Sequence, residues 1–536
     1  MILGYEGLNN KAGWEAAGVK LPAFDIREMC AETAQRPVWV HIGAGNIFRA
    51  FIARAQQVLL NEGLAKSGIV AVSTHNYELI QKVYAPFDNL TLLVSLLPDG
   101  STEKEVIASV ADALCVGEDF PQDRETLKNI FRNPSLQLVS YTITEKGYAL
   151  RDIHGNLLPA VAAELEGGPK NCTNAMCFTT AMLLERYNAG GYPLAVVSMD
   201  NCSHNGEKLR DSVLTVAREW EKRGLVPSGF VAWLENEGSV SFPWTMIDKI
   251  TPRPSASIAA SLEAAGIEHM GLIPTDSRTN SAPFVNAEKP EYLVIEDRFP
   301  NGRPPLEKAG VYLTDRDTVN KTEKMKVTTC LNPLHTALAV YGCLLGYPSI
   351  AAEMKDPALK KLVENIGYRE GLPVVVDPGI LSPREFIDVV VEQRLPNPFI
   401  PDTPQRIATD TSQKVGVRFG ETIKSYLQDP SRNAGDLTCI PLAIAGWLRY
   451  LLAVDDEGNP MTCSPDPMLE TLQAQLAGVR LGEPDSADGK LMSILTNTSL
   501  FGTDLVAAGL GTKIETMFRQ MLAGPGAVRQ TLKAYL

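Results

Sequence analysis

The sequence predicts an α/β protein in which a doubly wound parallel sheet is followed by a predominantly α-helical C-terminal domain. Two observations predict this fold class. Apolar strand-like runs alternate with helical patterns in the N-terminal half, and helical patterns dominate the C-terminal half. A chain of 536 residues is also too long for a single hydrophobic core, so we expect two domains.

The first strand, expected at 38–42, runs into a glycine turn and an apolar-periodic helix that ends near Leu60. Gly43 allows a tight turn and Gly45 lets the backbone approach a pyrophosphate, whereas Phe48 stands at the third glycine position of the GxGxxG pattern. Strand, turn and helix in this order direct backbone N–H groups and a helix N-terminus at a phosphate. The stretch is typical of a Rossmann-type dinucleotide site.

The second strand, expected at 68–73, ends in Thr74, His75 and Asn76. In NAD sites this end usually carries an acidic residue that binds the adenosine ribose, and in NADP sites a nearby arginine holds the 2′-phosphate. Neither residue is present here. We expect NAD as the cofactor because nothing basic is nearby, and NADP stays open.

The other elements of this half are expected as strands at 90–97, 136–143 and 194–199, with helices at 103–114 and 179–187. Ligands of doubly wound sheets bind beyond the carboxyl ends of the strands. Two polar clusters stand at such ends, 142–148 and 198–206. Polar residues at strand ends are also ordinary turns and helix caps, so these clusters are candidates for the site and no more.

A stretch rich in proline and glycine, 294–305, is the best boundary between domains. We expect a dinucleotide-binding domain with an N-terminal lead-in at 1–304, and a mostly helical substrate and catalytic domain at 305–536. Helices of the second domain are expected at 333–345, 357–366, 383–393, 441–452, 467–476 and 514–522.

A lysine, an asparagine and a histidine stand together near the start of the helical domain. Asn332 and His335 are three residues apart and share a helix face, but Lys326 lies on the opposite side of a regular helix from His335. Two arrangements would bring all three together: a one-residue π-bulge, or a helix that starts at Asn332 as N-cap with Pro333 at its first position. Lys324 is the alternative lysine, and a buried helix entrance with two exposed lysines is the plain structural interpretation.

Composition excludes several classes of protein. The net charge of −13 argues against nucleic acid and anionic membrane surfaces, and no apolar run is long enough to span a membrane. Nine scattered cysteines without a CxxC pair, and six histidines without metal-ligand spacing, argue against a disulfide framework and a protein metal site. We expect a cytoplasmic protein that works without zinc.

The ordered motifs of the chain resemble the polyol-specific long-chain dehydrogenase (mannitol dehydrogenase) family, and most closely its fructuronate reductase (D-mannonate oxidoreductase) branch. The resemblance runs from about Val38 to about Leu476. Its anchors are GxGxxxRA at 43–50, TxTEKGY at 142–148, SxDNxxxNG at 198–206, FPxxMxDxI at 242–250, VIEDxFxxGRP at 294–304 and MKxxxxLNxxH at 325–335, extended by 410–414 and 445–450.

The resemblance implies roles for four catalytic residues. Lys326 would be the general base in alcohol oxidation and the general acid in ketone reduction, and burial favours the neutral amine that this requires. Asn332 and Asn201, one from each domain, would donate hydrogen bonds to the developing alkoxide. His335 would orient substrate hydroxyls. Here Asn332 follows Lys326 by six residues, one more than in the family, and this leaves Lys324 open.

The resemblance also implies binding residues. Asp248 would bind a substrate hydroxyl or position the lysine, and Arg406 would face the substrate, with Arg394 as its competitor, since either guanidinium suits a carboxylate. The cofactor-binding residues would be Ile42, Gly43, Ala44, Gly45, Asn46, Ile47, Phe48, Arg49, Thr144 and Glu145.

The function that we expect is metal-independent, NAD(P)-dependent interconversion of a keto sugar acid and its alcohol, D-fructuronate and D-mannonate, in carbohydrate and hexuronate metabolism. A mannitol 2-dehydrogenase-like or arabinitol dehydrogenase-like polyol oxidoreductase is the alternative within the class. A non-catalytic NAD-binding regulator is the alternative outside it, favoured by the extra residue before Asn332. Family resemblance implies a monomer or weak oligomer.

Overall fold

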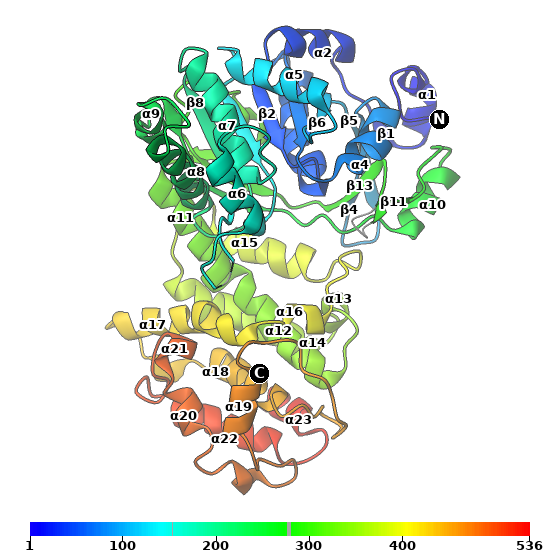
Figure 1. Ribbon diagram of the computed structural model, residues 1–536. Helices are drawn as coiled ribbons and strands as arrows, with labels where there is room; N and C mark the ends of the chain where they lie inside the picture. The colour runs from blue at the N-terminus through cyan, green and yellow to red at the C-terminus, as the bar shows by residue number, and fades with distance from the viewer. Residues whose placement is uncertain (153, 276–279) are drawn as a thin grey trace. The chain divides into compact units, whose positions relative to one another are not determined.

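The computed structural model describes residues 1–152, 154–275 and 280–536. The chain forms two compact units, of which the first contains residues 1–97 and 101–320, and the second contains residues 98–100 and 321–536. The sequence passes from one unit to the other inside helix α11 (Arg316–Met325), coloured green in Figure 1. The boundary after residue 304, with its division of roles, stays a prediction.

A six-stranded parallel sheet organises unit 1. Its order is β6 (Val110–Cys115), β3 (Ile69–Ser73), β2 (Trp39–Ile42), β7 (Leu138–Tyr141), β8 (Leu194–Ser198) and β9 (Val240–Ser241). This is the 3-2-1-4-5-6 order of the Rossmann fold, in which the chain reverses direction across the sheet between the first and fourth strands. The predicted parallel sheet is therefore confirmed, and the ends of β2 and β7 form its switch point.

Each face of this sheet has its own hydrophobic core. One face packs against α5 (Pro121–Arg132), α6 (Pro159–Gly167), α7 (Ala175–Asn188), α8 (Asn205–Lys222) and α9 (Phe230–Glu235), most of which are labelled around β8 in Figure 1. The other face packs against the π turn η2 (Phe48–Ile52), α3 (Ala53–Asn61) and a second π turn η3 (Ile80–Tyr84). Helices on both faces explain why every strand residue of β2, β3, β7 and β8 is buried.

The helix expected at 103–114 is wrong. This segment forms β5 (Thr102–Ile107) and β6, because β5 pairs with β4 (Thr91–Leu96) along its whole length and β6 pairs with β3. The strand expected at 90–97 exists as β4, but it lies outside the doubly wound sheet. It belongs to a four-stranded sheet with β1 (Val19–Lys20), β5 and β13 (Phe284–Glu288).

A three-stranded sheet completes the part of unit 1 that matters for the site. Strand β10 (Thr245–Asp248) pairs antiparallel with β14 (Tyr292–Glu296), which pairs parallel with β15 (Tyr312–Thr314). Smaller elements of unit 1 are α1 (Lys11–Ala16), α2 (Ile26–Gln35), α4 (Tyr77–Leu79), α10 (Ala256–Ala264), β11 (Ile273–Pro274) and β12 (Asn280–Ser281).

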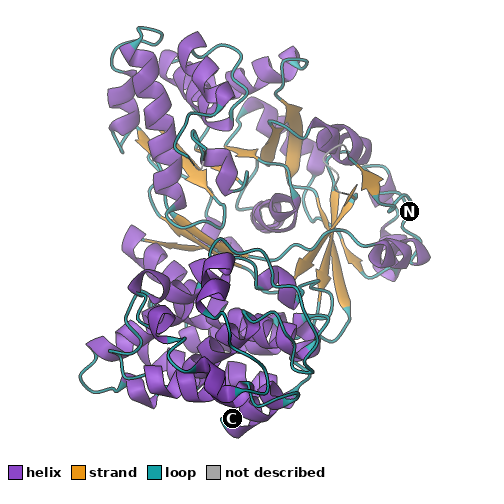
Figure 2. Cartoon of the chain, turned by 60° about the horizontal axis from the view of Figure 1, so that its bottom comes forward, coloured by secondary structure: helices purple, strands orange, loops and turns teal. Residues whose placement is uncertain are grey.

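Unit 2 is helical, and every named strand among the described residues lies in unit 1; strands are orange and helices purple in Figure 2. Its predicted helices are confirmed as α12 (Asn332–Leu345), α14 (Pro357–Glu364), α15 (Pro383–Val389), α18 (Cys439–Tyr450), α19 (Leu469–Gln475) and α22 (Gly511–Met521). The other α-helices of unit 2 among the described residues are α13 (Ile350–Glu353), α16 (Pro404–Ile407), α17 (Glu421–Gln428), α20 (Met492–Leu495), α21 (Thr498–Phe501) and α23 (Ala527–Ala534). Within the described residues, no helix is both long and apolar enough to cross a membrane.

Candidate active site

The glycine turn after β2 has the backbone that the sequence predicts. Gly43 adopts φ 112° and its N–H donates to the carbonyl of Val72 on β3 (2.9 Å). A Cβ at this position would lie 2.1 Å from the carbonyl oxygen of Thr142, so only glycine fits between β2 and the loop that follows β7. A Cβ on Gly45 would meet no protein atom within 4 Å, which leaves room beside the turn.

Four of the predicted cofactor residues, Ile42, Ala44, Phe48 and Arg49, are buried in the protein interior. Phe48 is fully buried and stacks on His41, with ring centroids 4.3 Å apart. The Arg49 guanidinium donates to Thr91 Oγ1 (3.1 Å) and to the carbonyl of Ala282 (2.9 Å), and Ile42 is 1% exposed. These contacts indicate that the side chains of Ile42, Phe48 and Arg49 hold the turn in place. Gly43, Ala44, Gly45, Asn46 and Ile47 form the turn and the start of its helix.

Asp200 fixes the second part of the predicted cofactor site. Its carboxylate accepts from the backbone N–H groups of Ile143 and Thr144 (2.9 Å each) and from the Tyr148 hydroxyl (2.6 Å). These bonds hold Thr144 at φ 66°, a conformation that is costly for a β-branched residue and that recurs at ligand sites. Burial raises the pKa of Asp200. Glu145, the next predicted residue, is exposed and pairs with Lys208.

Asn201 lies on the loop between β8 and α8, next to Asp200. The loop is tied down by Asn205, whose side-chain amide donates to the carbonyl of Asp200 (3.0 Å) and to Thr245 Oγ1 (2.8 Å). The Thr245 hydroxyl donates in turn to the carbonyl of Ser198 (2.7 Å). Asn201 is exposed while its supports are buried, so its amide is presented on a rigid loop.

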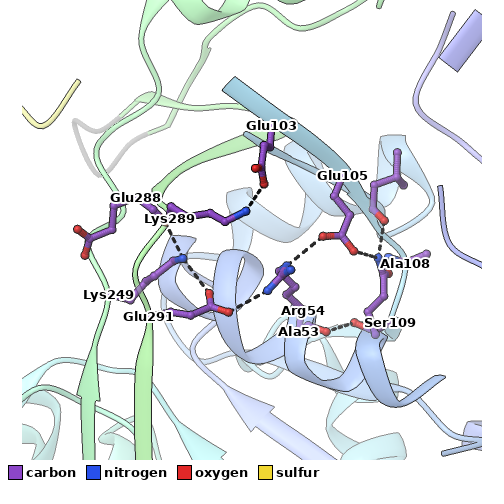
Figure 3. Close-up of polar contacts among 12 residues, drawn as sticks. Ala53, Arg54, Glu103, Glu105, Ala108, Ser109, Lys249, Glu288, Lys289 and Glu291 are labelled. Atoms are coloured by element: carbon purple, nitrogen blue, oxygen red, sulfur yellow. Dashed lines mark hydrogen bonds and ion pairs between the residues drawn. The ribbon is translucent and has the colours of Figure 1, made fainter. Parts of the chain in front are cut away.

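Asp248 ends β10 and is 6% exposed. The next residue, Lys249, anchors this end: its ammonium donates to the carbonyl of Glu288 (2.7 Å) and pairs with Glu291 (2.8 Å), as Figure 3 shows. Glu291 also pairs with Arg54 of α3 (2.8 Å). Burial lowers the pKa of Lys249. The network places Asp248 on a strand end that is bound to α3 and to the neighbouring sheet.

In unit 2, the extra residue between Lys326 and Asn332 is absorbed by a π turn. Residues Lys326–Cys330 form η7, and the N–H of Leu331 donates to the carbonyl of Lys326 (3.1 Å), an i to i+5 bond. Leu331 takes the N-cap position, α12 starts at Asn332, and Pro333 lies in its first turn. The π-bulge is therefore the arrangement that the chain uses, and Asn332 is not the N-cap.

Burial separates the two candidate lysines. Lys326 is 3% exposed, whereas the Lys324 side chain is 50% exposed and lies 3.7 Å from Glu421. Burial is the environment that a proton-transferring lysine needs, because it disfavours the charged ammonium. The structure thus favours Lys326. Asn332, at the start of α12, is partly exposed, and its amide makes no hydrogen bond with the described residues.

His335 is a neutral imidazole. Its Nε2 lies 3.4 Å from Asp402 Oδ2 but forms no hydrogen bond with the described part of the chain. Burial, followed by the charges of Arg418, Arg406, Arg394 and Lys414, lowers the pKa of His335 to about 3. The Asp402 carboxylate does not offset the charges of these four cations. A neutral ring with a free nitrogen can donate to or accept from a substrate hydroxyl.

Two cations of this cluster, Lys414 and Arg418, were not among the predicted site residues. Arg406 pairs with Asp402, and Arg394 is buried at the end of the π turn η10 (Val390–Arg394). Lys414 donates to the carbonyl of Thr409, and Arg418 donates to Thr336 Oγ1. Lys414 belongs to the segment 410–414, which carries part of the family resemblance, so the sequence contained a signal for this residue. Nothing in the sequence marks Arg418. Within the described ranges, no group of three or more His, Cys, Asp or Glu side chains is placed to hold a metal ion.

Two family models match these halves. The Mannitol dehydrogenase Rossmann domain matches residues 38–308, and the Mannitol dehydrogenase C-terminal domain matches residues 318–522. The chain belongs to the mannitol dehydrogenase family. Within this family, the D-mannonate oxidoreductase of Thermotoga maritima is 54% identical over 535 residues, which is 99% of this chain and 98% of that protein.

Solved structures of the family have the same fold over the full chain. D-sorbitol dehydrogenase in substrate-free form is similar with a TM-score of 0.81 at 27% identity, covering 99% of this chain and 100% of that one. Mannitol 2-dehydrogenase of Pseudomonas fluorescens, in a ternary complex with NAD and D-mannitol, is similar with a TM-score of 0.69 at 28% identity, covering 100% of this chain and 99% of that one. The expected fold class and family are confirmed.

Proposed function

We propose that this member of the mannitol dehydrogenase family is an NAD-dependent oxidoreductase that interconverts D-fructuronate and D-mannonate. The observation that carries the proposal is the 54% identity to a D-mannonate oxidoreductase along practically the whole chain. Polyol and mannitol enzymes of the family are more distant, near 30% identity. The excess of cations around His335 supports a substrate that carries a carboxylate.

The residues of unit 1 fit a dinucleotide. The glycine turn stands at the switch point of the parallel sheet, the space beside Gly45 is open, and the helix that begins at Asn46 points its N-terminus at the turn. The loop held by Asp200 presents Thr144 and Glu145 beside it. When bound, NADH supplies the hydride that reduces the ketone carbon of the sugar acid.

The predicted catalytic and substrate-binding residues would have distinct roles in the reaction. Lys326 would deliver a proton to the carbonyl oxygen during reduction and remove it during oxidation. The Asn332 and Asn201 amides would donate hydrogen bonds to that oxygen as negative charge develops on it. His335 and Asp248 would bind the flanking hydroxyls. These roles are supported by the neutral His335 ring and by the Asn332 amide, which makes no hydrogen bond within the described part of the chain.

A non-catalytic regulator is now the weaker alternative. The extra residue before Asn332 favoured the regulator, because it would shift Lys326 relative to α12. The π turn η7 accommodates one additional residue, so this argument for a regulator is weakened. The monomeric or weakly oligomeric state, the absence of nucleic-acid and membrane partners, and the cytoplasmic location stay predictions.

The test is to follow oxidation of NADH and NADPH by absorbance, with D-fructuronate, D-tagaturonate and D-fructose as parallel acceptors. We expect turnover with D-fructuronate and NADH. Preference for D-fructose would move the chain to the polyol enzymes, and silence with all three acceptors would leave the regulator as the better account.

A further inference from the structure

Arg418 is a partly buried guanidinium without a carboxylate partner. Its one side-chain hydrogen bond within the described residues goes to the neutral hydroxyl of Thr336, and no described carboxylate forms an ion pair with it. Burial lowers the pKa of Arg418 to about 10, with no opposing effect of a nearby acid. Desolvated charges in folded proteins are normally paired, so this guanidinium is prepared for an anion that the chain does not supply.

The other cations of the cluster are less suitable. Arg406 is paired with Asp402 and its side chain is 63% exposed. Lys414 has no ion pair with the described residues, but its ammonium donates to the carbonyl of Thr409, and its pKa is lowered by burial and by the charge of Arg418. Arg418 also offers the planar fork that binds a carboxylate through two parallel hydrogen bonds, which an ammonium cannot do.

The position of Arg418 matches the shape of a keto sugar acid. Its π turn, η12 (Gly416–Gly420), packs against both η7 and α12, the elements that carry Lys326 and Asn332. Thr336, which holds the guanidinium, lies four residues after Asn332 and therefore on the same face of α12, about 6 Å further along its axis. In D-fructuronate, four carbon–carbon bonds separate the ketone carbon from the carboxylate carbon, about 5 Å when extended.

We infer that Arg418, with Lys414 as a second cation, binds the carboxylate of the substrate and sets the preference for a sugar acid over a neutral ketose. The inference rests on the proposed function. A substrate whose ketone oxygen accepts from Asn332 and whose chain extends along α12 brings its carboxylate to Arg418. Arg418 is thus a specificity-determining residue, while proton transfer belongs to Lys326.

The experiment compares R418Q, R418K and wild type in steady-state reduction of D-fructuronate and D-fructose, with NADH varied separately. We expect R418Q to raise the KM for D-fructuronate about 10- to 100-fold, as loss of a charge-assisted bidentate pair does, with R418K in between. The kcat/KM for D-fructose and the KM for NADH should change by less than about twofold. R384Q is the control, since Arg384 is exposed and lies over the Tyr368 ring.

Calorimetric binding of D-mannonate to the enzyme saturated with NADH measures affinity without turnover, because the alcohol and the reduced cofactor cannot react with each other. In this titration, R418Q should lower the affinity for D-mannonate by a similar factor. The melting temperature of the R418Q variant should match that of wild type. Unchanged D-fructuronate kinetics in R418Q, an equal loss with both acceptors, or a larger effect of R406Q would each overturn the inference. An inactive wild type with D-fructuronate would instead reject the proposed function, so the two failures are distinct.

Discussion

Glu353 is a buried acid whose replacement should change how stability depends on pH. It lies at the end of α13, is fully buried, and neither carboxylate oxygen has a hydrogen-bond partner in the described chain. It packs beneath Gly342 of α12, where a Cβ would lie 2.1 Å from Glu353 Oε1. Burial, assisted by the charge of Asp356, raises the pKa of Glu353 from 4.5 to about 9.

The size and sign of the effect follow from proton linkage. Between the unfolded pKa of 4.5 and the folded pKa of about 9, the folded chain keeps a proton on Glu353 that the unfolded chain has released. The free energy of unfolding therefore falls as pH rises through this window, by about 1.4 kcal/mol per pH unit from this group. Between about pH 5.5 and pH 8 the loss amounts to roughly 3 kcal/mol.

E353Q keeps the shape of the protonated acid but cannot titrate, so this dependence should disappear. The assay is urea unfolding followed by far-ultraviolet circular dichroism at several pH values, for wild type, E353Q and the control E470Q, in which an exposed glutamate of α19 is changed. We expect the stability of E353Q relative to wild type to rise steadily with pH. Parallel pH curves for wild type and E353Q would refute the reasoning.

Three further results are expected. K326M should lower kcat for D-fructuronate reduction by about 10²- to 10⁴-fold in steady-state assays with NADH binding retained, whereas K324M should stay close to wild type; the reverse pattern would make Lys324 the acid. D200N should weaken NADH binding about tenfold in fluorescence titrations, because the loop of Thr144 loses carboxylate acceptors; unchanged affinity would contradict that role. K249M should lower the free energy of unfolding by about 2–3 kcal/mol in urea titrations, because it removes a buried ammonium that pairs with Glu291. The control K289M, which breaks the exposed pair of Lys289 with Glu103, should lower it by less than about 1 kcal/mol.

Local signals in the sequence were sufficient for the fold class and for the glycine turn after β2. A strand followed by a turn that only glycine can form identified β2 and Gly43, and apolar periodicity identified the helices of unit 2. The spacing of Lys326 and His335 predicted a break in the regular helix, either a π-bulge or a helix with Asn332 as N-cap, and the structure has the π turn. These conclusions need only the stereochemistry of neighbouring residues.

Tertiary structure decided the rest. The segment 103–114 has apolar spacing that suits a helix, yet it forms β5 and β6 because strands distant in the sequence pair with it, and the Pro-Asp-Gly turn at 98–100 was the missed signal. Likewise, sequence alone selected Arg406, with Arg394 as its competitor, and did not mark Arg418. Only the tertiary structure shows that Arg406 pairs with Asp402, and that Arg418 donates to the neutral hydroxyl of Thr336 and not to a carboxylate. Whether a charge is paired depends on contacts between residues far apart in the chain, and local sequence does not encode them.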